Sequence, residues 1–240
     1  VLMDAGADGL RRQQQRAAIT LAPGAPSVSS AEQLGALYAG ALATLLLGDA
    51  AGADAAVAKA TQLLRDKPSA SAERMFQQLR SQIALQRGDA PGAWKLLDGA
   101  GDSRPVLLLR GQVALTLWQG AGGAAACPAG GAAASPPAAA APAPTTSPIT
   151  APTTAPATPG AACDAATALR SSGEALRDWV PAHSQDALAW SLLAQTEEAL
   201  GQPLRALRAQ AEARVALGDI GGAIDRLRAA QSLVRAGSAN

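Results

Sequence analysis

A Gly-Asp dipeptide recurs along the chain, each time after a stretch whose apolar residues have helical spacing. Gly48-Asp49, Gly88-Asp89 and Gly218-Asp219 are three copies, and Gly201-Gln202 occupies a similar place. A glycine can end a helix in a conformation with positive φ, and an aspartate can cap the first turn of the next helix. The pattern therefore predicts pairs of antiparallel helices joined by tight turns.

Small residues stand at fixed distances from these glycines. Alanine or serine lies seven residues before each glycine, alanine lies five and twelve residues after it, and the ninth following residue is a large apolar one in three of the four copies. Positions four and seven residues apart share a helix face, so small residues let two backbones approach while the large one fills the groove. The predicted repeat core comprises Ala53, Ala93, Trp190, Leu193, Ala194, Ala206, Ala213, Ala223 and Leu227.

The composition favours helices throughout. Hydrophobic residues make up 48% of the chain, mostly alanine and leucine, whereas aromatic residues make up only 2%. A chain so poor in strand-forming residues is predicted to be all-α. The formal net charge of +1 gives no overall field that would attract nucleic acid or anionic lipid. We therefore expect no nucleic-acid partner, and because no apolar run is long enough to cross a bilayer we expect no membrane span.

Residues 120–162 differ in kind from the rest. They hold nine of the 16 prolines and no charged residue, with many alanines, glycines and threonines. Such a segment is typical of a mobile linker with polyproline character. The helical pattern resumes at Asp164-Ala165, so the segment is predicted to replace the turn of one hairpin. This gives divergent helical-hairpin repeats over 1–119, a low-complexity flexible insertion over 120–162, and a continuation of the array over 163–240.

Two cysteines, Cys127 and Cys163, flank this insertion. In an oxidising compartment a disulfide between them would hold the ends of the insertion together, and closing so long a loop stabilises by roughly 3 to 4 kcal/mol in the chain-entropy model. The alternative is two unpaired thiols in a flexible segment. We predict the disulfide.

No catalytic or metal site is predicted within this chain. The one histidine, His183, lies in a loop, and a single imidazole excludes an HExxH motif or a Ser-His-Asp set. The glycines of 218–222 lie between helices and lack a following Lys-Ser/Thr, so a turn is favoured over a phosphate loop. The four tryptophans are interpreted as core residues. Two interpretations exist for Arg205, Arg208, Arg214, Arg226 and Arg228, a basic stripe for an acidic partner or a solvated, ion-paired face. Glu198, Glu212 and Asp225 interleave with them at helical spacing, so we expect the ion-paired face.

The segment around Trp190 resembles a tetratricopeptide repeat. Trp190, Leu193, Ala194, Ala206 and Ala213 stand at the spacings of the W-x2-L-G/A-x2-Y…A…A signature. Glu197 occupies the position of the expected aromatic residue, Gln210 that of the usual phenylalanine, and the spacing of the turns is irregular. The resemblance implies a tetratricopeptide-like helical-hairpin solenoid built of divergent repeats. By its composition, the Ala/Pro/Thr-rich segment is predicted to be a disordered insertion in this solenoid.

The same region closely resembles the C-terminal repeats of periplasmic zinc metalloproteases of the β-barrel assembly-enhancing (BepA-like) family. The resemblance is carried by residues 186–195, 198–200, 208–219 and 223–227, and more weakly by 38–42 and 105–114. It implies a periplasmic location, and an HExxH domain holding zinc that would precede Val1 in a longer protein. None of the zinc ligands or catalytic residues of the family maps onto this chain, so the chain itself is expected to hold no cofactor.

The leading functional prediction is a protein-binding repeat region of such a protease, acting in outer-membrane protein assembly and quality control. It would recruit or position client polypeptides, either outer-membrane β-barrel proteins or their assembly machinery. The alternative is a non-enzymatic tetratricopeptide adaptor that scaffolds a protein complex. A solenoid that binds nucleic acid would need a basic face, and the balance of charges argues against it.

Overall fold

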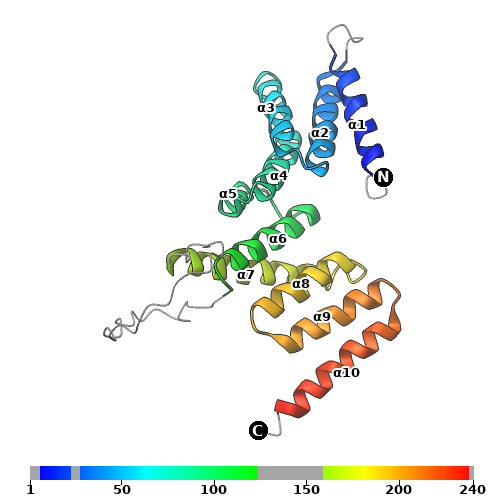
Figure 1. The fold of residues 1–240 in the computed structure, drawn as a ribbon, viewed down its shortest axis with the longest axis vertical. Coiled ribbons are helices and arrows are strands. Elements are labelled where there is room, and N and C mark those ends of the chain that lie inside the picture. Colours follow the sequence, from blue (N-terminus) through cyan, green and yellow to red (C-terminus); the bar gives the residue numbers. More distant parts are fainter. Residues whose placement is uncertain (1–5, 23–27, 124–158, 238–240) are drawn as a thin grey trace, which may run out of the picture. The chain divides into compact units, whose positions relative to one another are not determined.

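The computed structural model describes residues 6–22, 28–123 and 159–237, and within these ranges every regular element is an α-helix. The protein is therefore all-α over its described residues, as the sequence predicts. Contacts divide the chain into two compact units, Val1–Val113 and Ala114–Asn240, and the division falls inside α6. The helices in chain order (Figure 1) are α1 Ala7–Thr20, α2 Ser30–Leu46, α3 Ala50–Asp66, α4 Ala70–Gln86, α5 Ala90–Leu96, α6 Arg104–Gly120, α7 Pro159–Trp179, α8 Ala187–Ala199, α9 Pro203–Ala216 and α10 Ile220–Gly237.

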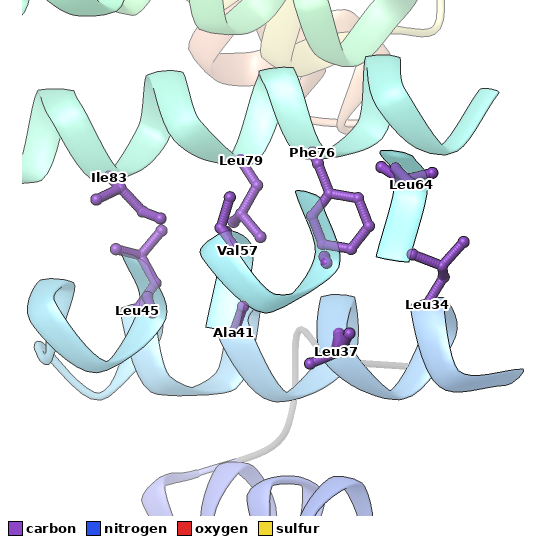
Figure 2. Close-up of a cluster of buried hydrophobic side chains, with 11 residues drawn as sticks. Leu34, Leu37, Ala41, Leu45, Val57, Leu64, Phe76, Leu79 and Ile83 are labelled. Carbon is purple, nitrogen blue, oxygen red and sulfur yellow. The ribbon is translucent and has the colours of Figure 1, made fainter. Parts of the chain in front are cut away.

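In the first unit each helix packs against the next one along the chain. Contacts join α1 to α2, α2 to α3, α3 to α4 and α4 to α5, and α2 also touches α4. Figure 2 shows side chains of α4 facing those of α2, with Val57 and Leu64 of α3 beside them. This three-helix core includes Phe76, whose ring meets the ring of Tyr38 edge to face with centroids 5.8 Å apart. Burial of these apolar side chains is the main favourable term in this unit.

Small residues line the places where neighbouring helices approach. Ala41, Ala53, Ala60 and Ala93 are fully buried, and so is Ser81. The Ser81 hydroxyl donates to the backbone carbonyl of Ala93 over 2.9 Å, so this buried polar group is satisfied by the facing helix. Gly40 of α2 lies where an added Cβ would be 3.0 Å from the Cβ of Ala17 in α1. The α1–α2 contact therefore depends on a residue without a side chain.

Two glycines of α2 give a matched test of this close approach. Gly35→Ala meets no atom within 4 Å, so we expect it to stabilise the protein by about 0.5 to 1 kcal/mol through helix propensity. Gly40→Ala gains the same propensity but presses on Ala17, so its effect on the free energy of unfolding should be at least about 1 kcal/mol less favourable. Urea denaturation of both variants measures the difference. Equal stabilisation by the two alanines would show that α1 and α2 do not meet at Gly40.

In the second unit the helices again pack in sequence order, α7 on α8, α8 on α9 and α9 on α10. Gly173 of α7 is buried, and a Cβ on it would lie 3.1 Å from the Cγ2 methyl of Thr196 in α8. Thr196 is itself fully buried, and its hydroxyl donates to the carbonyl of Leu192 over 2.9 Å. This contact brings the middle of α7 close to α8, which is where the candidate site described below is formed.

The helices flanking the predicted insertion extend further than the sequence pattern indicates. Gly120 is the last residue of α6, and α7 begins at Pro159, so both helices enter the range 120–162. Proline fits the first turn of a helix because its missing N–H would have no partner there, and the following Gly-Ala-Ala-Cys is rich in alanine. Residues 124–158, which make up most of the predicted insertion, lie outside the described residues.

Candidate binding site

The predicted turn residues form one recurring local structure. Gly48, Gly88, Gly201 and Gly218 all have positive φ, at 91°, 81°, 71° and 79°. Asp49, Asp89 and Asp219 each cap the following helix, accepting a hydrogen bond from the N–H of the residue three positions on over 2.8, 2.9 and 2.9 Å. Gln202 makes no side-chain cap bond.

The residue that receives each Asp cap is also a glycine. Gly52, Gly92 and Gly222 donate the capping N–H, and a Cβ on any of them would collide with the capping carboxylate. The full turn motif is thus Gly-Asp-x-x-Gly. The last glycine of this motif was not among the predicted turn residues, although a glycine stands three residues after each of the three aspartates. The carboxylate can lie directly over the helix N-terminus because that glycine leaves room for it.

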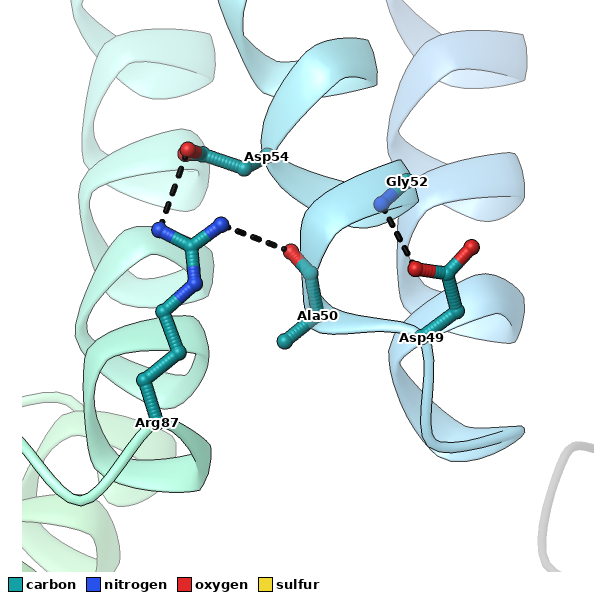
Figure 3. Close-up of polar contacts among 5 residues, drawn as sticks. All are labelled: Asp49, Ala50, Gly52, Asp54 and Arg87. Carbon is teal, nitrogen blue, oxygen red and sulfur yellow. Dashed lines mark hydrogen bonds and ion pairs between the residues drawn. The ribbon is translucent and has the colours of Figure 1, made fainter.

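Arg87, at the end of α4, links that helix to the start of α3, which follows the Gly48-Asp49 turn (Figure 3). Nη1 of Arg87 lies 3.1 Å from Oδ2 of Asp54, and Nη2 donates to the carbonyl oxygen of Ala50 over 3.2 Å. Both side chains of the ion pair are exposed, so it contributes about 0 to 1 kcal/mol. Its role is to hold the end of α4 against the start of α3.

The capping carboxylate of Asp219 gives the turn a pH dependence. Its pKa lies below the ordinary 3.8, first because the carboxylate accepts the Gly222 N–H and second because Arg214 lies 2.8 Å away. As the pH falls, the Asp219 carboxylate therefore becomes protonated at a higher pH in the unfolded chain than in the folded one. The stabilisation that this carboxylate gives is present above its ordinary pKa and is lost as the pH falls through its lowered, folded-state pKa. Asp219→Asn keeps a capping oxygen but cannot titrate. Urea midpoints between about pH 5 and pH 3 should fall more steeply for the wild type, and parallel curves would contradict this.

Most of the predicted repeat core is buried. This holds for Ala53, Ala93, Leu193, Ala194, Ala206, Ala213 and Ala223, whereas Trp190 is half-buried. Leu227 is 48% exposed, so its assignment to the core is corrected. The repeat spacing assigns a large residue at this position to a groove against a facing helix. Among the described residues only α9 packs against α10, and Leu227 does not face it closely enough to be buried.

A half-open cavity of about 260 Å³ lies among α7, α8 and α9 of the second unit. It is lined by Arg177, Val180, Pro181, Trp190, Leu193, Glu197, Arg205, Arg208 and Ala209, and is called the Glu197 cavity below. The side chain of Glu197 is 2% exposed. Nε of Arg177 lies 3.3 Å from Oε1 of Glu197 and also donates to the carbonyl of Gly173 over 3.1 Å. Oε2 of Glu197 has no hydrogen-bond partner among the described residues.

Glu197 was not among the predicted site residues and was interpreted only as a departure from the repeat signature. A signal was present, because Glu197 follows Trp190, Leu193 and Ala194 at seven, four and three residues, on the apolar face of the same helix. A charged residue at such a position is buried once the helix packs. The sequence therefore indicates that Glu197 is a buried charged residue. It does not indicate the cavity, because the cavity needs α7 and α9 as well.

The predicted ion-paired face is divided among different surroundings. Arg205 and Arg208 line the Glu197 cavity, Arg214 pairs with Asp219 at 2.8 Å, and Arg228 pairs with Asp225 at 3.4 Å. His183 is exposed and stacks on the Trp179 ring with centroids 3.6 Å apart. Of the tryptophans, Trp118 is buried, and the other three are half-buried: Trp94, Trp179 and Trp190.

Cys163 lies in the first turns of α7 and is disulfide-bonded. Its predicted partner Cys127 lies outside the described residues, so the pairing stays a prediction. Over the parts of the chain that the structure describes, no three His, Cys, Asp or Glu side chains gather in a way that could hold a metal ion. In the same ranges, no helix combines the length and apolar character needed to cross a membrane. No family model and no curated protein matches the chain.

Proposed function

We propose that this chain is a tetratricopeptide-like array of helical hairpins that binds other polypeptides. The observation that carries the proposal is the repetition of one turn, Gly-Asp-x-x-Gly with positive φ and an Asp cap, between helices that pack on their neighbours in sequence order. In such an array each hairpin buries its small-residue face against the next hairpin and leaves other faces open. Surfaces of this kind bind extended chains or helices through many contacts.

The resemblance to the BepA-like family gives the client class. We propose that the clients are outer-membrane β-barrel polypeptides that have not reached their folded state, or the machinery that assembles them. The array would belong to a periplasmic zinc metalloprotease whose HExxH domain lies outside this sequence. The disulfide at Cys163 supports an oxidising compartment, since disulfides persist there and are rare in the reducing cytosol.

Binding to an unfolded β-barrel polypeptide tests the proposal. A fluorescently labelled outer-membrane barrel protein is diluted from urea into the purified chain, and anisotropy is compared with that of the same protein folded in detergent micelles. We expect saturable binding of the unfolded form and little binding of the folded barrel. A carboxymethylated, permanently unfolded soluble protein serves as the control for client class. Failure of the chain to bind any of the three would overturn the proposed function.

A further inference from the structure

Glu197 has surroundings that stability alone does not explain. Within the described ranges it is the one charged side chain that is buried, and only one of its two carboxylate oxygens faces a cation. A buried carboxylate oxygen without a hydrogen bond is unfavourable, and native proteins contain few such groups. Because Glu197 lines a cavity, its buried carboxylate indicates that an occupant of the cavity supplies the missing donor.

The Glu197 cavity has two chemical sides. Val180, Pro181 and Leu193 give it apolar walls, and the half-buried indole of Trp190 adds an aromatic surface. Arg205 and Arg208 of α9 are exposed and have no ion-pair partner among the described residues. A volume of about 260 Å³ is smaller than common small-molecule sites, which measure about 300 to 1,000 Å³, and suits one large side chain.

The charges in the cavity restrict the chemistry of that side chain. Arg177, Arg205 and Arg208 against Glu197 give three positive charges and one negative, a net charge of +2. A lysine ammonium at Oε2 would be repelled by the surrounding guanidinium groups, and a ligand carboxylate there would be repelled by Glu197. A neutral hydrogen-bond donor avoids both of these repulsions. An aromatic ring is favoured further, because guanidinium groups are attracted to its face and the walls are apolar.

We propose, on the basis of the proposed polypeptide binding, that the Glu197 cavity takes a tyrosine side chain of the bound chain. The phenolic O–H donates to Oε2 of Glu197, and the ring packs on Val180, Pro181 and Trp190. The terminal torsion of a glutamate is soft, so the carboxylate can turn this oxygen toward the cavity. Acidic residues flanking the tyrosine meet Arg205 and Arg208. The site thereby selects tyrosine in an acidic stretch.

Short peptides test this selectivity in the full chain. Fluorescein-labelled peptides carry one central residue, Tyr, Phe or Lys, between aspartates in a Gly-Ser background, and binding is measured by anisotropy. We expect the Tyr peptide to bind about tenfold more tightly than the Phe peptide, because a hydrogen bond to a charged group is lost with Phe. In Glu197→Leu the two peptides should bind equally. If this variant is not helical, Glu197→Gln replaces it, and the Tyr preference should fall severalfold.

The contribution of the two α9 arginines of the Glu197 cavity to peptide binding is tested separately. Arg205→Ser and Arg208→Ser should weaken binding of the Asp-flanked Tyr peptide more than binding of a version flanked by Asn, because only the aspartates pair with these arginines. Arg226→Ser on α10, an exposed arginine outside the cavity, is the matched control and should have no effect. Equal binding of Tyr and Phe by the wild type, tighter binding of Lys, or a Tyr preference that survives in Glu197→Leu would each overturn the inference. Loss of the peptide preference alongside retained binding of the unfolded barrel polypeptide would leave the proposed function standing.

Discussion

Replacement of Phe76 by alanine is expected to lower the free energy of unfolding by about 3 to 5 kcal/mol, the range for removal of a large aromatic side chain from a core. Phe76 is 3% exposed and lies in the core formed by α2, α3 and α4 (Figure 2). The variant leaves a cavity beside Tyr38 and removes the edge-to-face contact between the two rings.

Met75→Ala is the matched control for this prediction. Met75 precedes Phe76 on the same helix but is 45% exposed, so its removal should change stability by about 0.5 kcal/mol or less. Both variants are followed by the helical circular dichroism signal in a urea titration. Similar losses in the two variants would mean that α4 does not present Phe76 to a packed core.

The helix ends were predictable from sequence because their chemistry is local. A positive φ favours glycine whatever surrounds it, and an aspartate can reach the N–H three residues on without help from the rest of the chain. Gly48-Asp49 and Gly88-Asp89 therefore mark turns in the sequence and have the corresponding geometry in the structure. The all-α class follows from composition in the same way, since strand-forming residues are scarce.

The Glu197 cavity was not predictable, because it is built by side chains from three different helices. Arg177, Glu197 and Arg208 come from α7, α8 and α9 in turn, and no spacing along the chain states that their side chains meet. Leu227 shows the opposite limit. Its position in the repeat is correct for a core residue, but burial also needs a helix to cover it, which a repeat pattern by itself does not supply.

The Arg177–Glu197 pair should respond unequally to removal of its two members. Arg177→Met leaves Glu197 buried without its cation. Breaking a buried pair in this way costs about 3 to 5 kcal/mol, and because Arg177 is 39% exposed to water we expect a smaller loss, about 2 to 3 kcal/mol. Glu197→Leu removes the buried charge itself, together with its unsatisfied oxygen, so the expected change is within about 1 kcal/mol in either direction.

The double variant Arg177→Met with Glu197→Leu decides between a pair that stabilises the fold and a carboxylate kept for another purpose. If Glu197 is a cost in the absence of a ligand, the double variant should recover most of the stability lost in Arg177→Met, measured by urea denaturation of all four proteins. Additive losses would show instead that Arg177 and Glu197 do not interact, and a large loss in Glu197→Leu alone would show that the pair holds α7 against α8. Recovery would mean that leucine at position 197 gives the unbound protein about the same stability as Glu197 does. This is expected if the hydrogen bond of Glu197 is completed only by a bound polypeptide.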